Sequence, residues 1–183
     1  MSRTVPAASL AVLLLVGASV PARAQGLMGD LIKDIATLES KFVGLAKAMP
    51  DTKYDWRPAA GVRSVGEVLL HVVADNYVMP FAVGVDPDPA TGISMTDFKT
   101  FSGFEKKHLG QAEMVAAIEK SFAHLKKAMT ESPDAKLGED LKFFGQTMSR
   151  QSMWVATTTH LHEHLGQLVA YARSNGIVPP WSK

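Results

Sequence analysis

Apolar residues recur at helical spacing in four separate stretches of the chain. In the first, residues 31–49, they follow at alternating intervals of four and three positions, which places them on one stripe of an amphipathic helix. The second stretch begins at Ser64-Val65-Gly66-Glu67. In this capping-box pattern, the Ser hydroxyl and the Glu carboxylate satisfy backbone amides at a helix start. We expect this helix to end near Pro80, because proline cannot continue a helix.

The other two stretches lie in the C-terminal half of the chain. A third helix is predicted over residues 111–130, and a fourth over residues 149–174, where Asn175-Gly176 supplies a left-handed stop. Residues 141–144 are expected to be extended. Residues 86–110 are rich in turn formers, and such a length is typical of a functional lid or an undetected short element. The pattern predicts an all-α four-helix bundle with a long loop between helices two and three.

The amino terminus has the pattern of a secretory signal peptide. Arg3 provides a positive start, residues 10–20 are uncharged and mostly apolar, and Ala22-Arg23-Ala24 has the small-x-small form of a cleavage site. We expect residues 1–24 to be removed, leaving residues 25–183 as one domain that is periplasmic or secreted. The apolar run is shorter than the roughly 20 residues that a membrane-spanning helix needs. No stable membrane anchor is therefore expected, although a retained one is the alternative.

Composition narrows the chemistry that the chain can perform. Its 183 residues, 46% hydrophobic and 20% charged, suit one globular domain. Lys and Arg number 19 against 18 Asp and Glu, so the chain lacks the basic excess of a nucleic-acid-binding protein. The sequence contains 0 cysteines, which excludes thiolate nucleophiles, disulfides and Cys-type metal sites. Any metal must therefore be held by histidines and carboxylates.

Two histidines of the fourth helix have the spacing of a metal-binding pair. His160 and His164 are four residues apart, which separates them by about 40° around the helix axis. Such a pair can deliver two imidazole nitrogens to one cation without straining the backbone. His162 is rotated by about 200° from His160 and is expected on the surface. The alternative is that the pair is buried and satisfied by backbone carbonyls.

A third ligand must come from another helix, and His71 lies at the edge of the apolar stripe of helix two. Glu67 and Asp75 lie one turn to either side of it. Three histidines from two helices leave coordination positions open, as catalytic sites do. The pair in helix four lacks the adjacent Glu of the H-E-x-x-H motif, so a protease of that class is not supported.

Four segments of the chain carry a family resemblance: Trp56-Arg57-Pro58, the run from Ser64 to His71, the run from His160 to Leu168, and Asn175-Gly176-Ile177-Val178-Pro179-Pro180. Together they resemble the DinB-like family, four-helix-bundle proteins that include YfiT-type metal-dependent hydrolases and some thiol transferases. The resemblance covers nearly all of the mature chain. It implies a divalent metal, most often nickel or zinc, held by His71, His160 and His164.

The leading hypothesis is an exported metal-dependent enzyme of hydrolase or transferase type that acts on an unknown small-molecule substrate. A bound divalent ion lowers the pKa of its water toward neutrality, which provides a nucleophile. Glu67 is favoured on spacing as the proton acceptor, ahead of Asp75 and Glu163, and the alternative is that it only caps its helix. The transferase hypothesis is weakened by the export signal, because those relatives use a cytosolic thiol.

Two other functional classes stay open. One is a non-catalytic metal-binding or stress-related protein, and the other is a metal-free bundle that acts by association. A homodimer is possible, and its contact is expected near an exposed group of aromatic residues, Trp56, Phe101 and Phe104. Trp154 and Gln167 are expected to line the site. His108 and His124 are expected to lie on the surface.

Overall fold

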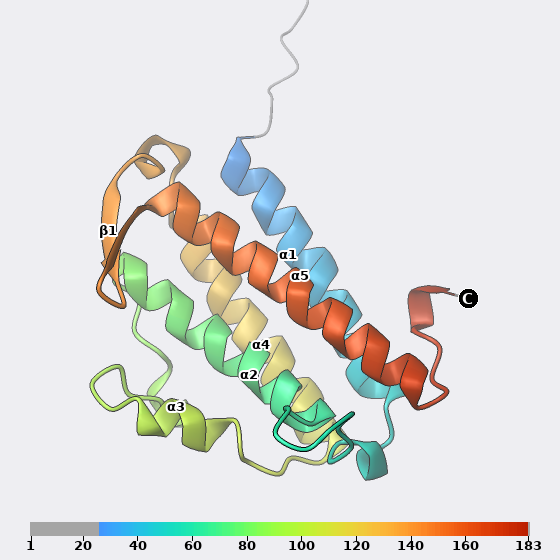
Figure 1. The fold of residues 1–183 in the computed structure, drawn as a ribbon. Helices are drawn as coiled ribbons and strands as arrows, with labels where there is room; N and C mark the ends of the chain where they lie inside the picture. Colours follow the sequence, from blue (N-terminus) through green and yellow to red (C-terminus); the bar gives the residue numbers. More distant parts are fainter. Residues whose placement is uncertain (1–25, 183) are drawn as a thin grey trace, which may run out of the picture.

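Four long helices form the framework of the protein. The computed structural model describes residues 26–182, so the predicted signal peptide lies outside the described residues. The long helices are α1 (Leu27–Ala48), α2 (Val65–Val78), α4 (Gln111–Thr130) and α5 (Arg150–Ser174). Both α1 and α2 pack against α4 and α5, and α2 and α5 lie side by side (Figure 1). The predicted four-helix bundle is confirmed.

Shorter elements connect and cover the bundle. They are one short helix, two strands and five 3-10 turns: α3 (Lys99–Phe104), β1 (Asp140–Phe143), β2 (Gln146–Ser149), η1 (Asp51–Lys53), η2 (Met79–Val83), η3 (Pro89–Thr91), η4 (Asp134–Lys136) and η5 (Pro180–Ser182). None of the helices in residues 26–182 is both long and apolar enough to cross a membrane.

The first helix begins four residues before its apolar stripe. The carboxylate of Asp134, in η4, accepts a hydrogen bond of 3.0 Å from the backbone amide of Met28. This bond satisfies one of the amide donors that a helix start leaves without an intrahelical partner. The extension thus depends on a residue far along the chain, which the local pattern does not contain.

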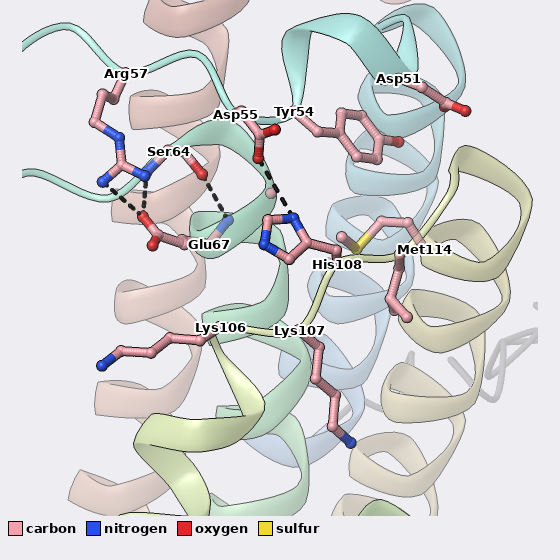
Figure 2. A pocket seen from close by; sticks show the side chains of 12 residues that line it. Asp51, Tyr54, Asp55, Arg57, Ser64, Glu67, Lys106, Lys107, His108 and Met114 are labelled. Carbon is pink, nitrogen blue, oxygen red and sulfur yellow. Dashed lines mark hydrogen bonds and ion pairs between the residues drawn. The ribbon is translucent and has the colours of Figure 1, made fainter.

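The predicted capping box is present at the start of α2. The amide of Glu67 donates to Ser64 Oγ at 3.2 Å, and the amide of Ser64 donates to Glu67 Oε2 at 2.7 Å (Figure 2). Beyond this start, α2 is buried nearly all round rather than on one stripe. The long segment after α2 explains this, because α3 packs against the outer side of the helix.

The two strands form an antiparallel hairpin just before α5. Phe143 pairs with Gln146, so Phe144 and Gly145 alone make the turn, with φ of 49° and 76°. The extended segment predicted at residues 141–144 is confirmed within one residue, whereas β2 was not predicted. A left-handed conformation at both turn positions matches the right-handed twist of the strands. The hairpin directs the chain into α5, whose start Ser149 caps.

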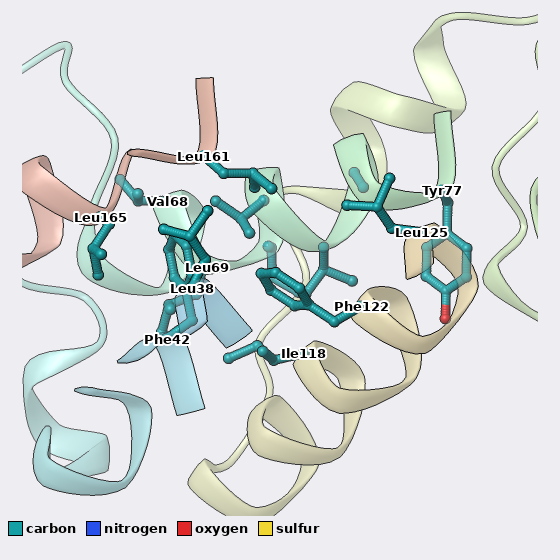
Figure 3. Packing of buried hydrophobic residues seen from close by; sticks show 14 of the residues in the cluster. Leu38, Phe42, Val68, Leu69, Tyr77, Ile118, Phe122, Leu125, Leu161 and Leu165 are labelled. Atoms are coloured by element: carbon teal, nitrogen blue, oxygen red, sulfur yellow. The ribbon is translucent and has the colours of Figure 1, made fainter. Parts of the chain in front are cut away.

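The core lies between the four long helices (Figure 3). The rings of Phe42 in α1 and Phe122 in α4 are fully buried and lie 5.7 Å apart, a separation typical of favourable aromatic pairs. Each buried side chain of this size stabilises the fold by about 1.5–3 kcal/mol. On α5 one stripe of apolar residues is buried throughout: Leu161, Leu165, Leu168 and Ala172. This packing fixes the rotation of α5 and of the histidines that border the stripe.

The aromatic group expected to form a dimer contact is not exposed. Phe104 is buried, and Phe101 is partly buried beside α2. Trp56 packs edge-on against Tyr171, with 5.3 Å between ring centroids. The prediction of an exposed patch at these residues is wrong, because α3 and the loop before α2 fold their rings inward.

Candidate metal centre

Three imidazole rings from two helices meet at one point between α2 and α5. One nitrogen each from His71, His160 and His164 lies within 4.8 Å of the other two. The His164 ring centroid lies 4.6 Å from that of His71 and 4.4 Å from that of His160. His71 and His164 are only 8% and 7% exposed, whereas His160 is more accessible. The predicted grouping of these residues is confirmed, and the cluster is compatible with metal binding.

The tautomer of His164 follows from the hydrogen bonds behind it. The Tyr171 hydroxyl donates to the backbone oxygen of Arg63 at 3.2 Å, so it accepts from Gln167 Nε2 at 2.9 Å. The Gln167 Oε1 atom therefore faces His164 Nδ1, which lies 2.9 Å away. Because an amide oxygen only accepts, Nδ1 carries the ring proton and Nε2 carries the lone pair.

That lone pair has no partner within the described part of the chain. His164 Nε2 is buried without a hydrogen bond. Burial, together with the nearby rings of His160 and His71, lowers the pKa of His164, although Gln167 acts in the opposite direction. The ring is thereby kept neutral, the form in which imidazole binds metals. An unsatisfied buried acceptor costs about 1–3 kcal/mol, which a bound cation would offset.

Asp75 links two of the three rings. Its Oδ2 atom lies 2.6 Å from His160 Nε2 and 3.1 Å from His71 Nε2. This hydrogen bond raises the pKa of His160, against the opposing effect of burial. A carboxylate at this point can serve as a further ligand, or it can hold the ring of His160 toward a cation through Nε2.

Glu105, just after α3, positions the third ring from behind. Its Oε1 atom lies 2.6 Å from His71 Nδ1, and Arg63 holds both carboxylate oxygens at 3.1 and 3.2 Å. Burial would raise the pKa of Glu105, but the hydrogen bonds from His71 and Arg63 outweigh it and lower the pKa. The carboxylate accepts a hydrogen bond from Nδ1–H, so Nε2 of His71 faces the cluster. Metal-binding histidines commonly have such a partner.

Glu67 has different neighbours. Its carboxylate accepts the capping bond from Ser64 and forms a 3.1 Å ion pair with Arg57. It borders a polar surface cavity of about 360 Å³, across from Lys106 and His108 (Figure 2). These contacts account for the capping role, and the role of Glu67 as proton acceptor stays a prediction.

The other residues singled out from the sequence fall into two groups. His108 and His162 are exposed as predicted, and His162 Nε2 lies 2.7 Å from Asp34 Oδ2. His124 was wrongly placed on the surface, because its ring packs 5.0 Å from Tyr77 with Nε2 buried.

The two residues expected to line the site differ in outcome. Gln167 contacts His164 directly, as described above. Trp154 is fully buried in the hydrophobic core near the start of α5, so its part in the structure is packing.

Comparison with known proteins identifies the family to which the chain belongs. The family described as the DinB superfamily matches residues 35–168. The crystal structure of a DinB-like protein from Bacillus cereus is 17% identical, with a TM-score of 0.68 over 85% of this chain and 97% of that chain. A DinB-like protein from Bacillus subtilis is 12% identical, with a TM-score of 0.60 over 80% and 92%. No curated protein matches the chain. Because the family match spans most of its length, the chain belongs to the DinB superfamily.

Proposed function

We propose that this protein binds one divalent metal ion through His71, His160 and His164 and uses it to catalyse a hydrolase- or transferase-type reaction on a small molecule. The observation that carries the proposal is the buried Nε2 atom of His164, whose lone pair belongs to the three-histidine cluster and has no hydrogen-bond partner among the described residues. The hydrogen bond between His164 Nδ1 and Gln167 Oε1 favours the neutral ring, with Nε2 unprotonated. This is the state that a metal ligand requires.

The donor set favours nickel or zinc. Neutral imidazole suits both ions, and no thiolate exists to select a softer one. Three protein ligands leave room for water or substrate, unlike the four of a structural zinc site. A bound ion would supply a polarising charge and an activated water.

The acids of the site have separate roles in the proposal. Asp75 orients His160 and Glu105 orients His71, and Asp75, which also faces His71, can accept a proton at Oδ2. Glu67 is retained as the proton acceptor predicted from the sequence, with its capping role as the alternative. The signal-like amino terminus supports export, so we propose that the mature protein works in the periplasm or outside the cell.

Metal titration of the protein without a histidine tag tests the ligands. We expect His160→Ala and His164→Ala to abolish tight binding of zinc and nickel in calorimetry while helicity stays near wild type. His162→Ala is the matched control, because it removes an exposed imidazole from the same helix. Wild-type affinity in either ligand variant would overturn the assignment.

Removal of the metal separates catalysis from the other classes. We expect the bundle to stay folded when a chelator strips the ion, with a melting temperature lowered only by the contribution of metal binding, because the hydrophobic core holds the bundle without it. A large fall would favour a structural, non-catalytic ion. Protein that takes up no metal would leave association as the remaining function.

A further inference from the structure

A row of aromatic rings leads from the turn of the hairpin to the metal centre. The rings of Phe144 and Phe98 meet edge-on at 5.1 Å, and Phe98 lies 5.9 Å from Phe101. Phe101 in turn meets the His71 ring edge-on at 5.9 Å. The three phenylalanines come from the hairpin and from α3 with its N-terminal flank, so folding alone brings them together. We call them the aromatic row.

The outer end of the aromatic row is open to solvent. Phe144 is 56% exposed and Phe98 is 48% exposed. The rings therefore contribute far less to the core than buried phenylalanines do. Exposed apolar surface next to a cluster of polar side chains is characteristic of binding sites. The inner end of the row touches His71, which makes the row a continuation of the metal centre.

Phe144 also has an unfavourable backbone conformation. It takes the first position of a two-residue turn with φ of 49°, where asparagine or glycine is preferred. A bulky residue in the left-handed region is an outlier, and such outliers concentrate at functional sites. The exposed ring gains little core packing to offset this conformation. Its ring contacts are the edge-on contact with Phe98 and a tilted contact with the neighbouring Phe143, whose ring centroid lies 4.1 Å away.

We propose that Phe98, Phe101 and Phe144 form a subsite for the aromatic portion of a substrate whose polar group lies at the metal. Phenyl rings bind one another in edge-on or offset arrangements at 4.5–7 Å between centroids, the spacing already present in the row. This subsite rests on the proposed function, because it assigns a substrate class to the same metal centre.

A pair of hydroxamates tests the subsite on the zinc-loaded protein. Acetohydroxamate offers only a metal-binding group, whereas 4-phenylbutanohydroxamate adds a phenyl ring on a flexible linker. We expect calorimetry to show about tenfold tighter binding of the phenyl compound to wild type. Phe98→Ala and Phe144→Asn should remove most of this preference without changing the affinity for zinc or acetohydroxamate.

The Asn variant distinguishes binding from structure. Because asparagine suits the turn, we expect Phe144→Asn to keep or raise the melting temperature while it weakens the phenyl compound. Trp181→Ala is the control, since it removes another exposed aromatic ring, which lies against α1. It should leave both hydroxamates unaffected.

The outcomes separate the two proposals. Equal binding of both hydroxamates to zinc-loaded wild type, or an unchanged preference in the Phe98 and Phe144 variants, overturns the subsite and leaves the metal site standing. Failure of zinc itself to bind overturns the proposed function, and the subsite with it. A wild-type dimer that Phe144→Asn dissociates, with no change in ligand preference, identifies the row as a contact between two copies and also overturns the subsite.

Discussion

The Oδ2 atom of Asp75 lies 2.6 Å from Nε2 of His160, across the boundary between α2 and α5. The same oxygen lies 3.1 Å from Nε2 of His71, one turn earlier on its own helix. One carboxylate thus sets the relative orientation of two rings that different helices carry. Its side chain is only 13% exposed, so solvent screens these contacts little.

Asp75→Asn should weaken metal binding while the bundle stays folded. The amide keeps the size of the carboxylate but loses its charge and one of its two acceptor atoms. We expect zinc affinity to fall by about 10- to 100-fold, the range typical for partners that orient metal ligands. Asp34→Asn is the control, because it makes the same change beside the exposed His162. Equal affinities of the two variants for zinc would contradict a role for Asp75.

Gln167→Ala should remove the preference of His164 for the tautomer protonated at Nδ1. In the wild type we expect nitrogen NMR to show His164 protonated at Nδ1 and bare at Nε2, as the hydrogen bond to Gln167 requires. The variant should populate both tautomers and bind zinc at least about tenfold more weakly. Gln151→Ala, an exposed change on the same helix, should alter neither measurement.

Elements with strong local periodicity were predictable from the sequence. The predicted range of α4 matches Gln111–Thr130, because one apolar stripe with clear breaks at both ends defines it. By contrast, α3 spans fewer than two turns, which is too short for a period to register. Strand β2 was missed because its burial does not alternate, and its position follows from the hairpin turn.

The same distinction between local pattern and distant contacts applies to the residues of the site. His160 and His164 follow from helix geometry alone, and His71 follows from its place at the stripe edge together with the family resemblance. Glu105 was not predictable, because it lies 34 residues from His71 along the chain and directly after α3, a helix too short to show a period. The surface assignment of His124 failed for a similar reason, since a ring from a different helix, Tyr77, covers it.

The two roles considered for Glu67 predict different outcomes for its variants. Glutamine can take the place of glutamate in a capping box, so Glu67→Gln should retain most of the stability measured by urea unfolding. Ser64→Ala removes the other half of the box and should cost about 1 kcal/mol. Hydrolysis of 4-nitrophenyl acetate by the zinc-loaded protein then tests whether Glu67 acts as the proton acceptor. A proton acceptor requires a rate lower by about 100-fold or more in Glu67→Gln, and an unchanged rate limits Glu67 to capping.

Tyr54 should make the protein sensitive to alkaline pH. Its hydroxyl donates to the backbone oxygen of Ala46 at 3.0 Å, and the side chain is 6% exposed. Burial, with a smaller effect of the Asp51 carboxylate, raises the pKa of Tyr54 to about 12. Above pH 10 the unfolded chain loses this proton first, because its tyrosine keeps the ordinary pKa. The contribution to stability is therefore complete below about pH 10 and is lost as the pH rises toward about 12.

Tyr54→Phe isolates this effect from the other groups that titrate in alkali. The rise of the Tyr54 pKa from 10.0 to about 12 corresponds to a loss of stability on the order of 3 kcal/mol across that range in the wild type. At neutral pH the variant should be less stable by about 1 kcal/mol, because it lacks the hydrogen bond to Ala46. As the pH rises from about 10 to about 12, its free energy of unfolding should fall less steeply than that of wild type. Because the loss in wild type exceeds the initial difference of about 1 kcal/mol, the two curves should approach each other and then cross. Parallel curves over this range would show that Tyr54 ionises equally easily in the folded and unfolded chains.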